Sequence, residues 1–253
     1  MQMGLEQEFF LVNGDDQIIT IPTGSGLPHD ECGWLLEARG KPFGNITEAV
    51  FSLKADVHRL DRSIMKTNAS TNQLHRMVAE PFRTIPRTVR TAASRNYAKG
   101  LTHYQNLYGY PHHNLPEGVF AAGIHITFSQ IRTVATKHGD VEYCENFDWP
   151  RLFRMLDAEF TTEIANARRL PGFYEIKSTG MVEYRSLPNN LDLEAIPDRV
   201  TEVFRRWGRK EPENYLPPVI PKEVFERAVA TEGGSGCPNC GFDAESGQFA
   251  GTQ

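Results

Sequence analysis

The sequence contains no long apolar run and no surplus of positive charge. Its longest uncharged stretch, residues 118–131, is too short and too polar to cross a bilayer. Lysine and arginine number 27 against 32 aspartate and glutamate residues, which gives a net charge of -5 and a pI near 5.9. These values argue against a membrane protein and against a broad nucleic-acid surface. With 253 residues, 40% of them hydrophobic, the chain can bury a large core.

Cysteine is scarce, with only four residues in the chain. Cys32 and Cys144 stand alone in the sequence, so the pattern does not predict a disulfide framework and we expect reduced thiols. No basic segment followed by an apolar run opens the sequence. A cytoplasmic location is therefore the expectation.

The remaining two cysteines form a Cys-x-x-Cys, Cys237 and Cys240, which follows the run Gly233-Gly234-Ser235-Gly236. A run rich in glycine and serine is typical of a flexible linker, so we expect one domain over residues 1–230 and a flexible tail over 231–253. The Cys-x-x-Cys is half of a structural zinc site, which needs four ligands. A Zn²⁺ site at Cys237 and Cys240 stays open if other cysteines, a histidine or another subunit complete it.

Hydrophobic periodicity predicts alternating strands and helices along most of the chain. Strands are expected where apolar residues alternate or run together, and helices where they recur every three to four residues. The expected strands are 4–10, 17–21, 29–40, 118–129, 173–176 and 181–187; the expected helices run from Asn45 or Thr47 to about 66, from 148 to 169, and onward from Pro197. This order predicts an α+β fold, with helices packed on one side of the sheet.

A basic stretch between residues 67 and 116 contains Arg83, Arg87, Arg90, Arg95 and Lys99, interrupted by prolines. A solvated helix or loop face explains this pattern most simply, and binding of an anionic ligand is the alternative. No site residue is assigned to it.

The stretch Gly4-Leu5-Glu6-Gln7-Glu8-Phe9-Phe10 places two carboxylates on one strand face. Side chains of a strand alternate between faces, so Glu6 and Glu8 lie about 7 Å apart on the same surface. No basic residue is near in sequence to neutralise them. An isolated Glu-x-Glu is usually a solvent-exposed face, and its meaning here depends on the other acidic strands.

Further polar residues that could bind a metal or take part in catalysis occur on the other expected strands. They are Glu37, His125, Glu183 and Arg185. Together with Glu6 and Glu8 they form a ligand set suited to two or more Mg²⁺ or Mn²⁺ ions, because hard cations prefer oxygen ligands and accept an occasional imidazole. Arg185 would then be a fixed cation suited to a phosphate that the metals also contact.

Each of these residues has an ordinary structural explanation when considered alone. His125 can be a hydrogen-bonded core histidine, and Glu37 a solvent-exposed group at a strand end. Glu183 and Arg185 can be a surface ion pair of little energy. Their joint occurrence favours the metal interpretation.

Three segments resemble motifs of the carboxylate–amine ligases of the glutamine synthetase and glutamate–cysteine ligase superfamily. Residues 4–10 resemble its Gly-x-Glu-x-Glu-Phe opening strand, and Ala122-Gly123-Ile124-His125-Ile126 resembles its Gly-x-His strand. Residues 181–188, Met-Val-Glu-Tyr-Arg-Ser-Leu-Pro, are similar to its closing Glu-Tyr/Phe-Arg-Ser motif. The motifs occur in the family's order, and small single-domain amidoligases often found in phage genomes are similar to this chain over about residues 3–209. For a phage-encoded protein the cytoplasm would be that of the host.

The resemblance implies a fold and a role for each matching residue. The fold would be an antiparallel-rich sheet forming a concave active-site funnel, with helices on its outer side. Glu8 and Glu37 would hold a metal near the acyl substrate, and Arg185 would stabilise the transferring phosphoryl group. A metal on the ATP phosphates would be held by Glu6, His125 and Glu183. A weaker match at residues 169–175 implies that Arg169 binds a substrate carboxylate and that Glu175 acts as a base.

The implied activity is ATP-dependent amide formation between a small-molecule carboxylate and an amine, through an acyl phosphate, with release of ADP and phosphate. ATP and Mg²⁺ or Mn²⁺ would be the cofactors, and a homo-oligomer stays open. Other interpretations stay open as well. They are a metal-dependent amide hydrolase, a guanidino phosphotransferase, and a non-catalytic metal-binding phage protein.

Overall fold

The computed structural model describes residues 1–21, 24–29, 33–86, 89, 104–109, 119–210, 242–243 and 248–249. Within these ranges, no helix is long and apolar enough to cross a membrane. The domain boundary near residue 230 and most of the tail, including Cys237 and Cys240, lie outside the described residues. Zinc binding by these two cysteines therefore stays open, and flexibility of the tail stays a prediction.

A mainly antiparallel sheet of seven strands is the centre of the fold, in the order β2-β1-β7-β11-β10-β5, with β3 also paired to β1. The longest strand, β1, pairs with β2 along one edge and with β7 and then β3 along the other, since Phe10 has a partner in both β2 and β3. The strands are β1 (Gln2–Asn13), β2 (Leu35–Arg39), β3 (His75–Val78), β5 (Tyr104–Asn106), β7 (Gly123–Ser129), β10 (Phe173–Ile176) and β11 (Val182–Pro188).

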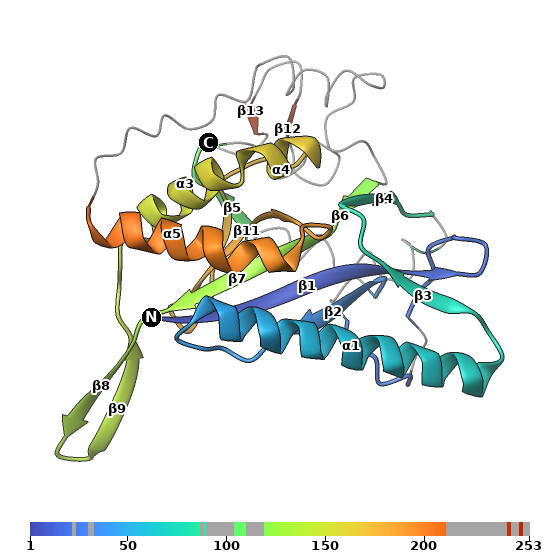
Figure 1. Cartoon of the computed structure of the whole chain (residues 1–253), viewed down its shortest axis with the longest axis horizontal. Helices are drawn as coiled ribbons and strands as arrows, with labels where there is room; N and C mark the ends of the chain where they lie inside the picture. The colour runs from blue at the N-terminus through green and yellow to red at the C-terminus, as the bar shows by residue number, and fades with distance from the viewer. Residues whose placement is uncertain are drawn as a thin grey trace.

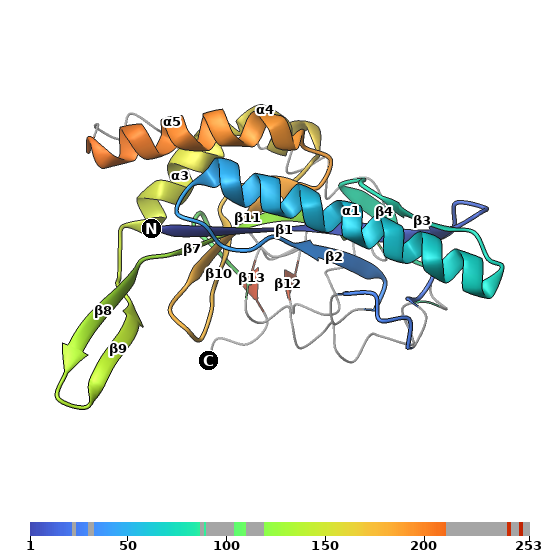
Figure 2. The ribbon, with the colours of Figure 1, turned by 60° about the horizontal axis from the view of Figure 1, so that its bottom comes forward.

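All described helices cover one side of this sheet (Figures 1 and 2). They are α1 (Ile46–Thr71), α3 (Trp149–Glu159), α4 (Thr161–Asn166) and α5 (Ile196–Gly208), with a short 3₁₀ turn at Leu193–Ala195. The Asn45 side chain accepts a hydrogen bond from the Thr47 backbone N–H at 2.8 Å and so caps α1. The predicted mixed class, with helices on one side of the sheet, is confirmed.

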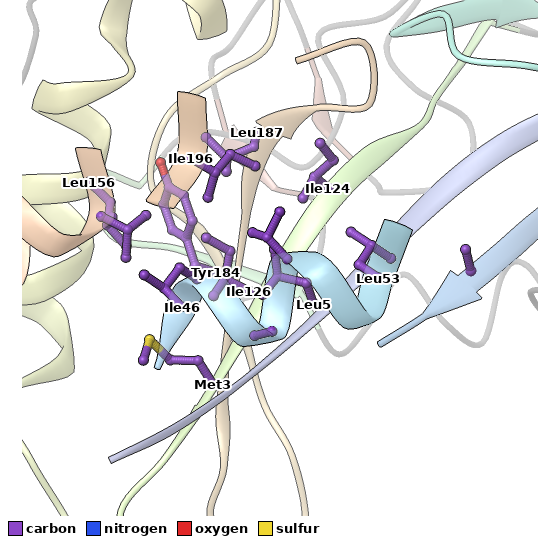
Figure 3. Packing of buried hydrophobic residues seen from close by; sticks show 14 of the residues in the cluster. Met3, Leu5, Ile46, Leu53, Ile124, Ile126, Leu156, Tyr184, Leu187 and Ile196 are labelled. Atoms are coloured by element: carbon purple, nitrogen blue, oxygen red, sulfur yellow. The ribbon is translucent and has the colours of Figure 1, made fainter. Parts of the chain in front are cut away.

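The main core lies between the helices and the sheet (Figure 3). Leu5 of β1, Ile126 of β7 and Tyr184 of β11 face this layer, and Leu53 of α1 packs against them from the helix side. Strand side chains alternate, so the neighbours of these core residues point to the opposite face. That opposite face carries no described helix.

A second apolar cluster occupies one end of the helix-free face. It contains Phe10, Val12, Ile18, Trp34, Leu35, Val78, Ile85 and Ala122. Phe10 follows Glu8 by two residues on the same strand, so this face changes from charged to apolar along β1. The charged part of the face is therefore bounded by a packed apolar end.

Two predicted elements are interrupted in the structure. The predicted helix 148–169 breaks at Phe160 into α3 and α4, where the Arg199 guanidinium lies 4.1 Å from the centre of the buried Phe160 ring. The predicted strand 118–129 divides at Ala122 into β6 (Val119–Ala121) and β7. β6 leaves the main sheet and pairs with β4 (Phe82–Thr84). At both breaks the chain contacts tertiary partners that periodicity does not show.

Other predicted boundaries shift modestly. α1 continues past the expected end near residue 66 to Thr71, and the chain turns at Asn72 with a positive φ of 52°. The expected strand 17–21 makes only the single bridge between Ile18 and Val12. In the basic stretch, Arg83 pairs with Glu80 at 2.8 Å and also with Asp16. Arg87, Arg90, Arg95 and Lys99 lie outside the described residues.

A hairpin that the sequence analysis did not predict projects from the body (Figures 1 and 2). It consists of β8 (Ile131–Thr136) and β9 (Gly139–Cys144), which pair with each other in a separate two-stranded sheet. Its base lies near the turn between β10 and β11, since a Cβ on Gly180 would be 3.3 Å from the Cys144 Cβ. Two short strands, β12 (Phe242–Asp243) and β13 (Gln248–Phe249), form a separate pair.

Asp157 of α3 is a buried carboxyl on the helix side of the sheet. It accepts hydrogen bonds from the Tyr184 hydroxyl at 2.7 Å, the Tyr108 hydroxyl at 2.9 Å and the Gly172 backbone N–H at 3.0 Å. Burial raises its pKa from 3.8 to about 6, although these donors favour the ionised form. The folded state thus holds this proton more tightly than the unfolded chain does.

This carboxyl should make stability depend on pH. Because its folded pKa is raised, its favourable contribution is complete below about pH 4 and is lost as the pH rises through about 6. Between pH 4 and pH 7 the wild-type free energy of unfolding should fall by up to about 3 kcal/mol relative to Asp157→Asn. Urea denaturation of both proteins across this range measures the difference, and parallel pH profiles would contradict the assignment.

Candidate metal centre on the helix-free face

The antiparallel register brings acidic residues of neighbouring strands together on the helix-free face. Glu6 of β1 lies opposite His125 of β7, and Glu8 lies opposite Glu37 of β2. Further along the sheet, Glu183 of β11 pairs with Thr127 of β7 on one side and with Glu175 of β10 on the other. Residues far apart in sequence therefore share one surface.

Glu6, His125 and Glu183 form the tightest cluster. One ligand atom from each lies within 4.8 Å of the other two. The His125 Nδ1 is 2.8 Å from the Glu6 Oε1 and 3.8 Å from the Glu183 Oε1. Two carboxylates and an imidazole at this spacing can hold a divalent cation.

Within this cluster, His125 is almost fully buried. Burial, and then the positive charge of Arg185, lower its pKa well below the ordinary value. The imidazole is therefore neutral near pH 7, and a neutral imidazole is the form that binds a metal.

Glu183 is held in its ionised form by its neighbours. Burial favours the protonated carboxyl, but the charges of Arg185 and Lys177 outweigh it, so the pKa of Glu183 is lowered. The Thr127 hydroxyl donates to the Glu183 Oε2 at 2.9 Å, and the Lys177 Nζ lies 3.2 Å from the same oxygen. Arg185 pairs with the other carboxylate oxygen.

Glu8 and Glu37 form a second acidic pair beside the first cluster. Both are buried, and their direct opposition on adjacent strands is unfavourable unless a cation lies near. The Gly123 backbone N–H donates to the Glu8 Oε2 at 2.8 Å, and the Arg185 Nη2 lies 3.7 Å from the Glu8 Oε1. Arg39 pairs with Glu37, and its Nε lies 3.5 Å from the Glu6 Oε2.

A β-bulge in β11 sets the direction of Glu183 and Arg185. The register to β7 shifts between Tyr184, opposite Ile126, and Leu187, opposite Ile124. The additional residue lets Tyr184 and Leu187 both enter the core, while Glu183 and Arg185 stay on the helix-free face. Without it, Leu187 would face the charged cluster.

Arg169 lies behind this bulge and ties it to the start of β7. Its guanidinium donates to the carbonyl oxygens of Arg185 at 2.7 Å, Ala122 at 2.9 Å and Ser186 at 3.1 Å. Burial lowers its pKa to about 10, which still leaves it charged at neutral pH. These contacts position the backbone of Arg185, and binding of a substrate carboxylate by Arg169 stays a prediction.

Gly123 leaves room for this arrangement. A Cβ at position 123 would lie 3.0 Å from the Arg169 Nη2 and equally close to the His125 Nε2. A side chain here would press directly on the imidazole and on the guanidinium. Steric crowding therefore explains why the Gly-x-His segment has a glycine at position 123.

The structure also adds a cation that the sequence analysis did not assign. The Lys177 Nζ lies 2.7 Å from the Glu175 Oε2 as well as near Glu183. Glu175 is itself 3.5 Å from the Arg185 Nη1, so the expected base lies within the cluster. Lys177 follows Glu175 by two residues, and this spacing on a strand was a signal that it shares the face.

No protein-family model matches the sequence, and no similar sequence was found among curated proteins. The interpretation of this face therefore depends on its geometry and charge. Carboxylates of Glu6, Glu8, Glu37, Glu175 and Glu183 converge there, opposed by Arg39, Lys177 and Arg185. Such a face favours a further cation.

The cluster predicts metal binding that single substitutions weaken. Wild-type protein should bind Mn²⁺, and Glu183→Gln or His125→Ala should weaken binding by about tenfold or more, because each removes a ligand atom. Titration calorimetry, with electron paramagnetic resonance of free Mn²⁺, measures the affinity. Glu142→Gln on the exposed β9 strand is the matched control, and equal affinities for all these proteins would refute the site.

Proposed function

We propose that this protein is an ATP- and Mg²⁺-dependent ligase that joins a carboxylate to an amine. The observation that carries the proposal is the juxtaposition of the Glu6–His125–Glu183 cluster with Arg185 on one helix-free face. These residues come from the three segments that resemble carboxylate–amine ligase motifs. The proposal includes a glutamine synthetase-like sheet whose open face forms the active-site funnel.

The charge of the face supports phosphoryl transfer. Bound Mg²⁺ would neutralise the phosphate oxygens of ATP and align its terminal phosphoryl group. Glu6, His125 and Glu183 are suited to the ion on the phosphates, and Glu8 with Glu37 to an ion near the acyl substrate. These acidic residues are fixed by strand pairing, so little reorganisation is needed when charge arrives.

Arg185 is suited to the transferring phosphoryl group. Its guanidinium lies near Glu8 on one side and near Glu175 and Glu183 on the other. The bulge and Arg169 fix its backbone. A planar cation held in this way can stabilise negative charge that develops on phosphate oxygens.

The proposed reaction has two steps that balance. A substrate carboxylate oxygen attacks the γ-phosphorus of ATP, ADP leaves, and an acyl phosphate forms. The amine nitrogen then attacks the acyl carbon, the C–O bond to phosphate breaks, and phosphate leaves. The amine loses a proton, for which the Glu175 carboxylate is the proposed acceptor. The Lys177 Nζ lies 2.7 Å from the Glu175 Oε2 and so holds that carboxylate in place.

A nucleotide-dependent assay tests this function. With Mg²⁺ and a pool of carboxylates and amines, the protein should release ADP and phosphate in an amine-dependent manner. Arg185→Ala should lower kcat by about a thousandfold, because it removes a cation from the transferring group. Arg76→Ala, which removes an exposed partner of Asp16, is the matched control, and circular dichroism checks that both variants fold.

The other outcomes identify the alternatives. Release of AMP would contradict an acyl-phosphate mechanism. Turnover without any nucleotide would indicate a metal-dependent hydrolase, since carboxylates and histidine also activate water. Phosphorylation of a guanidino compound would indicate a phosphotransferase. Absence of stabilisation by ATP and Mg²⁺ in a thermal-shift series would favour a non-catalytic metal-binding protein.

A further inference from the structure

A cavity of about 540 Å³ lies outside the edge of β2, between α1 and the segment 39–43 that leads into it. Its wall on the α1 side is the face that carries Phe51, Ala55 and Arg59. Cavities of this size hold drug-sized organic molecules. None of the acidic residues of the candidate metal centre lines this cavity.

The wall of the cavity is fixed by backbone contacts to α1. The Arg39 N–H donates to the Asp56 Oδ2 at 2.7 Å, and the Lys41 N–H donates to the Ser52 Oγ at 2.9 Å. Between them, Gly40 passes so close to the helix that a Cβ would lie 2.8 Å from the Leu53 backbone nitrogen. The cavity is therefore preformed.

The lining combines aromatic surface with a small surplus of positive charge. Phe43 packs partly against the core, whereas Phe51 is 76% exposed. Arg59 pairs with Asp56. Among the described residues the Lys41 ammonium group has no ion-pair partner. Arg39, Lys41 and Arg59 are opposed by Glu48 and Asp56, so the lining carries one positive charge in excess.

Arg39 connects this cavity to the candidate metal centre. Its guanidinium pairs with Glu37 and lies 3.5 Å from Glu6, and the residue is also one of those that line the cavity. A ligand in the cavity would therefore have its anionic end at Arg39, beside the acidic pairs. A nucleotide with several negative charges suits this lining poorly, because Glu48 and Asp56 oppose it and one excess cation matches a monoanion.

We propose that this cavity binds the carboxylate substrate, and that this substrate is an organic acid with an aromatic or similarly large apolar body. This inference rests on the proposed ligase function. The apolar body lies against Phe43 and Phe51, and the carboxylate is attracted by Lys41 and Arg39, which direct it to the metal centre. Phe51 is thus a specificity-determining residue, whose exposed ring the ligand covers.

Binding of 4-phenylbutyrate in the absence of ATP and Mg²⁺ tests the cavity itself. Titration calorimetry should show saturable binding of this acid, which Phe51→Ala and Lys41→Gln each weaken by about tenfold. Met65→Ala and Lys66→Gln, at exposed positions in the other half of α1, are matched controls and should leave the affinity unchanged. No saturable binding would overturn the inference.

Two further ligands distinguish recognition of the aromatic ring from recognition of the charge alone or of a nucleotide. Butyrate lacks the ring and should bind at least about tenfold more weakly; equal binding would show that the cavity recognises only the charge and would overturn the inference. AMP should not compete with 4-phenylbutyrate. Binding of AMP that is weakened by Phe51→Ala, without binding of the aromatic acid, would assign the cavity to a nucleotide instead.

Turnover distinguishes failure of this inference from failure of the ligase proposal. In a working ligase assay, Phe51→Ala should raise KM for an aromatic acid about tenfold and leave kcat unchanged, because the ring contacts only the remote part of the substrate. Turnover of small aliphatic acids that is insensitive to Phe51→Ala would refute the cavity and keep the ligase. Binding of 4-phenylbutyrate without any turnover would keep the cavity and refute the ligase.

Discussion

Carboxylates on one face of the sheet repel one another, and the rest of this structure has to offset that repulsion. Glu8 and Glu37 oppose each other on adjacent strands, and Glu183 has Glu175 as its neighbour on the next strand. Buried like charges are costly unless cations or hydrogen bonds offset them. Arg39, Lys177 and Arg185 each pair with at least one of these acids. Keeping so many ionised groups together lowers the stability of the fold, and such destabilising clusters are typical of functional sites.

The two faces of the sheet have different roles: one forms the core and the other carries the site. On the helix side, strand residues such as Leu5 and Tyr184 supply the apolar contacts that hold α1, α3 and α5 to the sheet. On the other side, the same strands hold the acids in fixed positions. The β11 bulge reconciles the two sides where they conflict, since it buries Leu187 without moving Arg185 away from Glu183. Arg169 braces the bulge from behind through backbone carbonyls.

Much of this arrangement was predictable from local patterns. The alternation in residues 4–10 and 181–187 predicted both strands, and it predicted that Glu6 shares a face with Glu8 and Glu183 with Arg185, because strand periodicity is a local property. At the break at Phe160 the ring contacts Arg199, and beyond the division at Ala122 the strand β6 pairs with β4. Neither partner is near in sequence. The register that sets Glu6 opposite His125 likewise needed the assembled sheet. Hairpin β8–β9 was missed because its residues alternate without a buried face.

The alternation of β1 has a consequence for how this chain can diverge. Core residues and site residues follow each other one by one along this strand, and β1 is paired along both edges. Substitutions can alter either face separately. A deletion or insertion of a single residue would exchange the faces beyond that point, placing acids against the helices and apolar side chains in the site. Among natural variants, this segment should therefore change in composition but keep its length.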